Sequence, residues 1–323
     1  MKHNIKITAI LLIMFFITQL IGLAVINAYS PKKITILNET TGKLEEVITK
    51  PQLPYGMQPP EELEKNPKQV LTSIVIAFTI AVLLIFLLMK IRAVVFLKLW
   101  FFFVVLIALS ITLNTLTINL KFSSSIAFLI ALPFAYLKIF KRNFLVHNLT
   151  ELLIYPGIAA VFVPILNLWA VIILLLLISV YDIYAVWHSG FMQKMAKFQI
   201  NKLNIFAGFF VPYMNKKTRE KIRFLKQKYK NKKISEKTLK SKKIKVNFAI
   251  LGGGDVVFPI ILAGVILRLY GFLPALIISI FATLSLLYLF IKAEKGKFYP
   301  AMPFLTAGCL IGLAVNYFFS YFI

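Results

Sequence analysis

Two aspartates, Asp182 and Asp255, are the only Asp residues in the chain, and both lie inside long apolar runs. An ionisable side chain in the hydrocarbon of a membrane costs about 2.5 to 3.5 kcal/mol on insertion scales, so its presence there predicts a function. Two carboxylates held close together share one proton. The ionised member activates water as a general base, while the protonated member donates a hydrogen bond to the carbonyl under attack. The pair therefore predicts peptide-bond hydrolysis with no metal, cofactor or covalent intermediate.

The spacing of the two aspartates supports such a pair. Asp182 lies about eight residues before the end of the apolar run 168–190, and Asp255 lies about nine residues after the start of the run 246–267. At 1.5 Å per residue in a helix, both side chains would lie roughly 12 to 14 Å below the same membrane surface. Depth alone leaves two alternatives open: each Asp pairs with a Lys, or the two form a proton or cation pathway in a transporter.

Three consecutive glycines precede the second aspartate, in the string Leu251 to Asp255. Inside a membrane helix each glycine costs about 1 kcal/mol of helix propensity relative to alanine. Such a run loosens the helix and removes side-chain bulk, which suits the close approach of an extended substrate backbone. Tight packing between helices explains one or two glycines better than three beside an Asp.

Three motifs occur in order along the chain: Tyr181-Asp182, then Gly252 to Asp255 as a G-x-G-D string, then Pro300 to Met302 before the last apolar run. Together, and over essentially the whole chain, they resemble the presenilin and signal peptide peptidase family of intramembrane aspartyl proteases. The third motif of that family is Pro-Ala-Leu, so Met302 is an apolar departure of similar volume. Prepilin peptidases also carry G-x-G-D, but they leave the third motif unexplained.

This resemblance implies roles for individual residues. Asp182 and Asp255 would be the catalytic pair. The residues that shape the substrate cleft or complete the motifs would be Tyr181, Gly252, Gly253, Gly254, Pro300, Ala301 and Met302. The resemblance further implies a transmembrane helix of a single-span protein as substrate, with its N-terminus outside. It also implies a microbial or archaeal homologue that acts without the accessory subunits of presenilin.

The elements that must position these residues are apolar runs. Of 323 residues, 59% are hydrophobic and only 15% are charged, which indicates an integral membrane protein. Nine runs are long enough to span a bilayer: 5–28, 69–90, 93–113, 119–139, 146–164, 168–190, 246–267, 272–292 and 302–322. We therefore expect an all-α polytopic protein with nine transmembrane helices and, from the resemblance, a presenilin-like fold.

The basic residues predict the orientation. The net charge is +25, and residues 191–245 alone hold 18 Lys and Arg against two Glu. This excess lies in loops rather than on a basic face with interleaved aromatics, so it favours a cytoplasmic loop over nucleic-acid binding. The remaining charged loops agree with an N-terminus inside and a C-terminus outside. Three parts follow: six spans in 1–190, the basic cytoplasmic loop 191–245, and three spans in 246–323.

Several polar features receive simpler interpretations. The Pro-rich loop 29–68 is expected to be irregular, and the apolar segment Ile205 to Met214 to lie at the membrane surface rather than to plug the site. Glu151 is expected to pair with Lys141 or Arg142, and His188 to be solvated. The three histidines are too scattered for a metal site, and neither H-E-x-x-H nor G-x-S-G is present, which disfavours zinc and serine proteases.

The sequence thus favours an intramembrane aspartyl endopeptidase of the cell membrane, with the lipid bilayer as its environment. An ion- or proton-coupled transporter is the alternative, although paired halves with broken helices are not found. The natural substrate, the cleavage position, homo-oligomer formation, the resting protonation of the pair and any autocleavage or regulation in 191–245 stay open.

Overall fold

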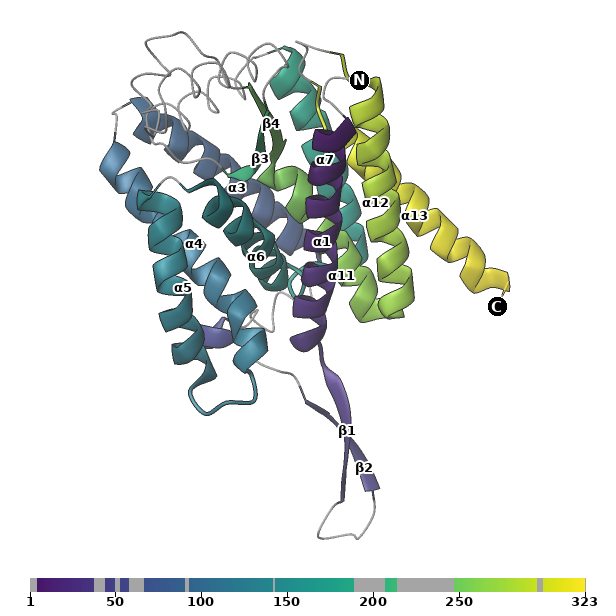
Figure 1. Cartoon of the computed structure of the whole chain (residues 1–323). Helices are drawn as coiled ribbons and strands as arrows, with labels where there is room; N and C mark the ends of the chain where they lie inside the picture. Colours follow the sequence, from purple (N-terminus) through teal and green to yellow (C-terminus); the bar gives the residue numbers. More distant parts are fainter. Residues whose placement is uncertain are drawn as a thin grey trace.

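A computed structural model describes residues 5–37, 44–49, 53–57, 67–90, 93–141, 143–188, 207–213, 247–294 and 299–322. Long helices dominate this part of the chain and pack into a bundle (Figure 1). A small sheet of two strands lies at the end of the bundle where α1 begins, and a second two-stranded hairpin projects from the opposite end.

The elements follow in chain order. The helices are α1 (Ile5–Ala28), α3 (Pro67–Lys90), α4 (Val94–Thr117), α5 (Ser123–Phe140), α6 (Phe144–Phe162), α7 (Leu168–Trp187), α11 (Gly253–Tyr270), α12 (Phe272–Lys292) and α13 (Met302–Phe322). The strands are β1 (Lys32–Leu37), β2 (Leu44–Thr49), β3 (Gly208–Tyr213) and β4 (Asn247–Gly252), and η1 (Pro54–Gly56) is a short 3-10 helix.

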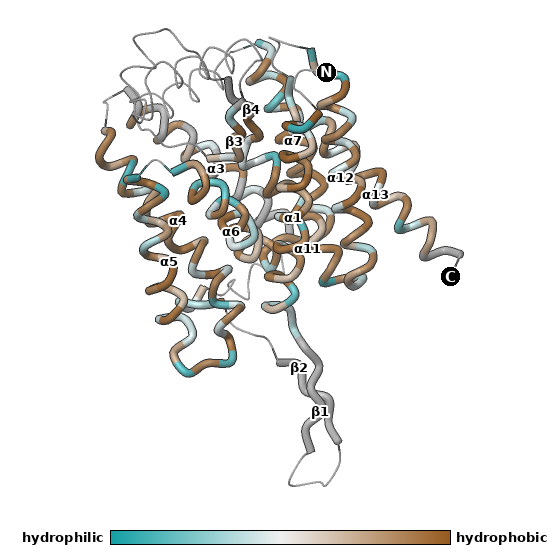
Figure 2. The backbone as a smooth tube through the Cα atoms, in the orientation of Figure 1, coloured by the Kyte–Doolittle hydropathy of each residue, from teal (hydrophilic) through white to brown (hydrophobic). Residues whose placement is uncertain are grey.

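Each of the nine predicted spans overlaps one of these helices, and the runs 5–28, 272–292 and 302–322 agree with α1, α12 and α13 to the residue. Within the described ranges, eight helices are identified as long and apolar enough to cross a membrane: α1, α4, α5, α6, α7, α11, α12 and α13. Hydrophobic residues cover most of the bundle (Figure 2). The prediction of a multi-pass, mainly helical membrane protein is confirmed, whereas nine spans and the orientation stay predictions.

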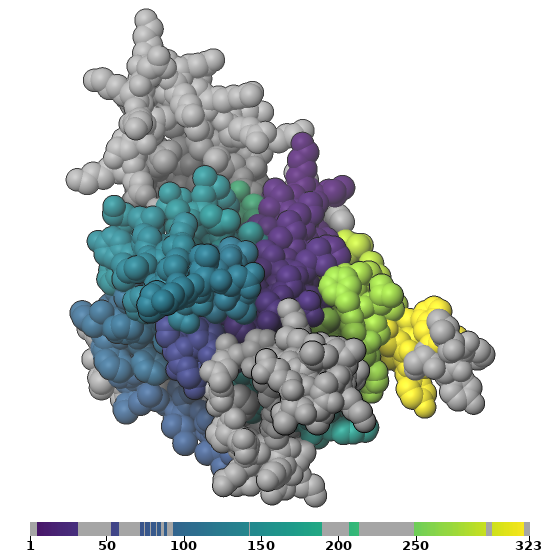
Figure 3. Space-filling model, turned by 90° about the horizontal axis from the view of Figure 1, so that it is seen from below, coloured from purple at the N-terminus to yellow at the C-terminus, as the bar shows by residue number. Residues whose placement is uncertain are grey.

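Helix α11 is the best-buried span, and it packs against α1, α6, α7, α12 and α13. Its residues from Val256 to Leu267 are buried apart from half-buried Phe258, which fits a helix that is apolar on all sides. Glycines allow the close approach: a Cβ on Gly22 of α1 would strike Ile260, and one on Gly264 would strike Ile26. Viewed from the end with β1 and β2, α1 lies between α4–α6 and α12 (Figure 3).

Two expectations about loops and spans are wrong. The loop 29–68 is not wholly irregular, because β1 and β2 pair as an antiparallel hairpin with Lys32 opposite Thr49. The run 246–267 is not one helix, because its first residues form β4, which pairs antiparallel with β3. β3, an apolar strand in the long loop, supplies hydrogen-bond partners for the backbone of β4. A local sequence pattern does not reveal this pairing, because the two strands are far apart in the chain. The all-α expectation therefore leaves out two small sheets.

Candidate active site

Asp182 lies on α7, and its side chain is bound by the start of α13. The residue is 4% exposed, and its Oδ2 accepts a hydrogen bond from the backbone N–H of Met302 at 3.1 Å. The N–H of Ala301 also donates to this carboxylate. The first N–H groups of a helix have no partner inside the helix, and its N-terminus carries partial positive charge. Asp182 thus caps α13 from a neighbouring helix.

The Pro300 to Met302 turn is built for this contact. Pro300 and Met302 are buried, and the carbonyl of Ala301 accepts from Leu305 N–H at 3.1 Å, so α13 begins at this turn. A second link holds the two helices together, since Ser179 Oγ and Thr306 Oγ1 lie 2.7 Å apart. The motif thus contacts Asp182 through backbone N–H groups. This contact does not depend on whether residue 302 is methionine or leucine.

Asp255 lies in the first turn of α11, not in the middle of a helix as expected. The helix begins immediately after Gly252, and Asp255 is its third residue. The carboxylate turns back, so that Oδ2 lies 3.0 Å from the place where a Cβ on Gly252 would stand, and the N–H of Gly252 donates to it. An acidic side chain at this helix position satisfies backbone donors and complements the helix dipole.

The structure places Asp182 and Asp255 within electrostatic range of each other. They come from α7 and α11, which pack against each other, and their carboxylates are close enough to interact electrostatically. Asp182 is buried, Asp255 is half-buried, and Gly254 beside it is exposed. Tyr181, one residue before Asp182, is half-buried and interacts electrostatically with it. The predicted residues therefore gather around one place between α7, α11 and the start of α13.

The three glycines have three different surroundings at the junction of β4 and α11. Gly252 makes room for the carboxylate of Asp255. A Cβ on Gly253 would lie 2.8 Å from the ring and hydroxyl of Tyr155 on α6. Gly254 has room for a side chain, since a Cβ there would make an ordinary van der Waals contact with Phe258 at 3.7 Å. The idea of a loosened mid-helix is wrong, because the glycines mark a change from strand to helix.

Sequence reasoning missed two residues that support the turn of Asp255. Gln19 on α1 is fully buried, and its Nε2 donates to the carbonyl of Val256 at 3.1 Å. Tyr155 is 3% exposed and packs edge-to-face against Phe209 of β3, with ring centroids 5.7 Å apart. Gln19 was detectable in principle, because an amide in an apolar run of 24 residues is costly unless it finds a partner. Nothing in the sequence linked Tyr155 to the glycines.

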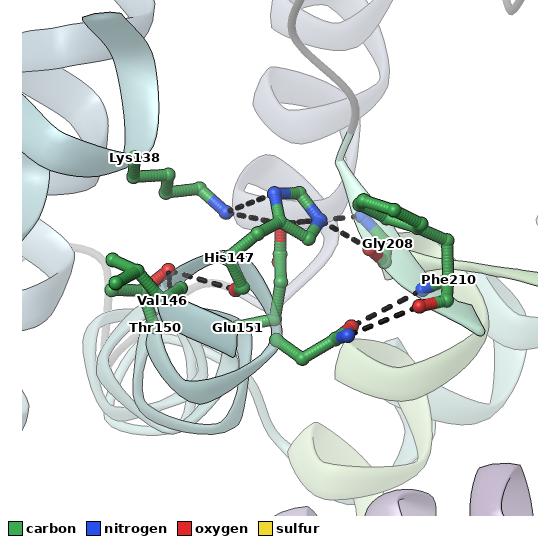
Figure 4. Close-up of polar contacts among 8 residues, drawn as sticks. Lys138, Val146, His147, Thr150, Glu151, Gly208 and Phe210 are labelled. Carbon is green, nitrogen blue, oxygen red and sulfur yellow. Dashed lines mark hydrogen bonds and ion pairs between the residues drawn. The ribbon is translucent and has the colours of Figure 1, made fainter. Parts of the chain in front are cut away.

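A buried ionic cluster lies beside the site on α5 and α6, and it corrects the prediction for Glu151. Glu151 Oε1 lies 2.5 Å from Lys138 Nζ, and both side chains are almost fully buried. Of the two partners that the sequence suggested, Lys141 is exposed and Arg142 lies outside the described residues. His147, one helical turn earlier, lies between them and β3 (Figure 4). The packing of α5 against α6 decided the partner of Glu151, because the Lys138 side chain is buried between these helices.

The expectation of an interfacial segment at Ile205 to Met214 is also wrong for its described part, residues 207–213. Phe209 is fully buried, and β3 packs against α6 and α11. The rest of the basic loop, 191–206 and 214–245, lies outside the described residues, as does any role of it. His188 is exposed at the end of α7 and stacks on Tyr184. No cluster of three metal-ligating side chains occurs among the residues the structure describes.

Comparison with known proteins agrees with this geometry. A family model described as signal-peptide peptidase, presenilin aspartyl protease matches residues 53–322. Two solved structures of a presenilin family intramembrane aspartate protease are similar in fold. The one in space group C222 has 15% identity and a TM-score of 0.53, covering 94% of both chains. The one in P2 has 18% identity and a TM-score of 0.53, covering 94% of this chain and 95% of that one. No curated protein sequence gives a match.

The family model covers most of the chain, so the chain belongs to the signal peptide peptidase and presenilin aspartyl protease family. It is an intramembrane-cleaving aspartic endopeptidase, a hydrolase embedded in a membrane as a multi-pass protein. None of these matches supports the transporter alternative.

Replacing single glycines will separate packing from motif. Gly253→Ala should destabilise the protein by about 1 to 3 kcal/mol, because its Cβ overpacks against the Tyr155 ring. Gly254→Ala should leave stability unchanged or raise it by up to about 1 kcal/mol, since the new methyl in the helix would meet only an ordinary contact with Phe258. Unfolding in detergent measures both, and equal destabilisation of the two variants would contradict this packing.

Breaking the buried ion pair will test its environment. Glu151→Leu leaves the Lys138 ammonium buried without its carboxylate, which should cost about 3 to 5 kcal/mol. The double variant Lys138→Met, Glu151→Leu removes both charges and should recover most of that loss. The measurement is again the unfolding midpoint, and a single variant as stable as the double one would show that Lys138 reaches water.

Proposed function

We propose that the chain hydrolyses peptide bonds within transmembrane segments of single-span proteins, with Asp182 and Asp255 as the catalytic pair. The observation that carries this proposal is that two carboxylates on α7 and α11 lie within electrostatic range of each other, within a family of intramembrane aspartyl proteases. The site residues around them would form the cleft. The substrate's N-terminus would be outside, in keeping with the N-inside orientation that the basic loops predict.

The pair would hold one proton between them. Oδ2 of Asp182 accepts the Met302 N–H, which favours the shared proton on another oxygen of the pair, because a protonated oxygen is the weaker acceptor. The ionised carboxylate takes a proton from water, whose oxygen bonds to the scissile carbonyl carbon, and the protonated carboxyl group donates to the carbonyl oxygen. When the tetrahedral intermediate collapses, the carbon–nitrogen bond breaks and the leaving amine receives a proton. Water and the two carboxyl groups suffice for these steps.

A substrate helix must unwind before this reaction, because its peptide bonds are shielded inside the helix. Its freed N–H and C=O groups then need partners, since none are available in lipid. The β4 strand leads directly to Asp255, and in the described part of the chain only β3 pairs with it. Addition of the unwound substrate to the other edge of β4 would satisfy those groups beside the carboxylates. Exposed Gly254 leaves space for a backbone there.

Asparagine at either aspartate tests the catalytic pair. Asp182→Asn and Asp255→Asn keep the shape of the side chain but remove the acid–base function, so cleavage should fall by at least about a hundredfold. The measurement is the initial rate on a single-span substrate with an outside N-terminus, in liposomes with purified protein. Asn316→Leu on α13 serves as a control, because Asn316 bonds the carbonyl of Pro274 away from the pair.

The outcomes separate the functions. If the parent cleaves and neither aspartate variant does, while Asn316→Leu still cleaves, the pair is catalytic. If the aspartate variants cleave at the rate of the parent, the assignment of the pair is refuted. If the parent cleaves nothing but conducts protons or ions in a manner lost in both variants, the protease proposal fails.

Pro300→Ala tests the turn at the start of α13. Pro300 restrains the chain just before the N–H groups that bind Asp182, so alanine should lower the cleavage rate by roughly tenfold without unfolding the bundle. Rate and unfolding midpoint are measured on the same preparation. A fully active variant would show that the turn needs no proline, and a variant that unfolds would assign the proline to stability.

A further inference from the structure

The two edges of the β3–β4 sheet differ. In an antiparallel pair, alternate residues direct their N–H and C=O groups to the partner strand and away from it. Gly253 N–H donates to Ala207 C=O at 3.3 Å, and Gly208 lies opposite Gly252 in the register. It follows that Gly208, Phe210 and Pro212 direct their backbone groups away from β4, to the outer edge of β3.

Side chains of α6 occupy that outer edge (Figure 4). Gly208 N–H donates to Glu151 Oε1 at 3.4 Å, and Gly208 C=O lies 2.9 Å from His147 Nε2. Asn148 makes a two-point contact with Phe210: its Oδ1 accepts from the N–H at 3.2 Å, and its Nδ2 donates to the C=O at 3.0 Å. These bonds replace the ladder that another strand would make.

The remaining position on this edge has no donor. Pro212 is the next residue directed outward, and proline has no N–H to offer a strand. Proline and covering side chains are the features by which proteins prevent pairing at a sheet edge. The outer edge of β3 is therefore closed at Gly208 and Phe210 by α6 and at Pro212 by its own chemistry.

Lys138 holds the α6 side chains in this arrangement. Its Nζ contacts Glu151 Oε1 and lies 3.4 Å from His147 Nδ1, so it donates to both. Because an ammonium group cannot share a hydrogen bond with Nδ1–H, the geometry fits a neutral imidazole whose Nε2–H donates to Gly208 C=O. The ion pair is thus part of the attachment of β3 and not a separate surface contact.

We propose that His147, Asn148 and Glu151 act as a surrogate strand that closes β3. They would fix the β3–β4 sheet beside α11 and direct an unwound substrate to the opposite edge of that sheet. Resting on the proposed function, this assigns the three residues as positioning residues and not as catalytic ones. By the same alternation, the open edge consists of the outward backbone groups of Phe248 and Ile250 and the C=O of Gly252, whose N–H donates to Asp255. Gly252 is three residues before Asp255, so the position of the β3–β4 sheet sets which substrate bond reaches the carboxylates.

Asn148→Leu tests the attachment independently of activity. Leucine has nearly the shape of asparagine and suits a membrane helix, but it makes neither bond to Phe210. Hydrogen–deuterium exchange of the segment 207–213 should become about tenfold faster, because the Phe210 amide loses its acceptor. Asn316→Leu, which removes an asparagine bond to a backbone carbonyl elsewhere, should leave exchange in 207–213 unchanged. Asn148→Ala repeats the test, and each variant's unfolding midpoint shows that it is folded.

Cleavage by the same variants tests the substrate half. When the β3–β4 sheet is loosened, the single-span substrate should be cut at additional neighbouring bonds and with a lower kcat, while KM changes less. Unchanged exchange in both Asn148 variants would overturn the attachment. Faster exchange with the parental cleavage position and rate would overturn the directing role. A parent that cleaves nothing would refute the proposed function, and the exchange result would still decide the attachment.

Discussion

A backbone N–H or C=O group without a partner costs several kcal/mol in the hydrocarbon of a membrane, and this constraint shapes the whole region around the two aspartates. Each place where a helix stops or starts at membrane depth needs substitutes for the missing bonds. The start of α13 receives the carboxylate of Asp182, and the start of α11 receives the carboxylate of Asp255. The residues proposed for catalysis therefore also accept hydrogen bonds from backbone N–H groups that have no partner within their own helix.

The same constraint explains why a strand pair can exist beside a membrane helix. A lone strand β4 would leave a full row of groups unpaired, and β3 supplies partners along one edge. The backbone groups on the outer edge of β3 bond to polar side chains of α6. The charged one among these side chains, Glu151, is paired with Lys138. Burial of these charges is tolerable because each is hydrogen-bonded as well as paired.

Close packing supplies the rigidity that such bonds require. Helix α11 is enclosed by its neighbours, and glycines at its contacts with α1 remove the bulk that would keep the helices apart. Gln19 reaches from α1 to the carbonyl of Val256, next to Asp255. The carboxylate thus sits on a turn that is held from three sides, by α1, by α6 and by the sheet, which limits its movement relative to Asp182.

Much of this protein was predictable from sequence, because membrane spans are written in local composition. Long apolar runs predicted the approximate position of each described helix, with α1, α12 and α13 correct to the residue, and two aspartates in apolar surroundings indicated a candidate place for the chemistry. The motifs around them identified the family that the match over 53–322 shows. None of these inferences required knowledge of which residues touch.

What needed the tertiary structure were the pairings between distant segments. The partner of β4 lies in β3, about 40 residues earlier, and the partner of Glu151 proved to be Lys138, although Lys141 and Arg142 lie closer in sequence. The glycines before Asp255 looked like a weakened helix until β4 showed a strand ending there. Apolar length and charge are local properties, whereas a hydrogen bond depends on which groups the fold brings within 3 Å or so. For that physical reason the sequence determined the spans and the candidate residues, and only the packing of helices decided how the carboxylates are held.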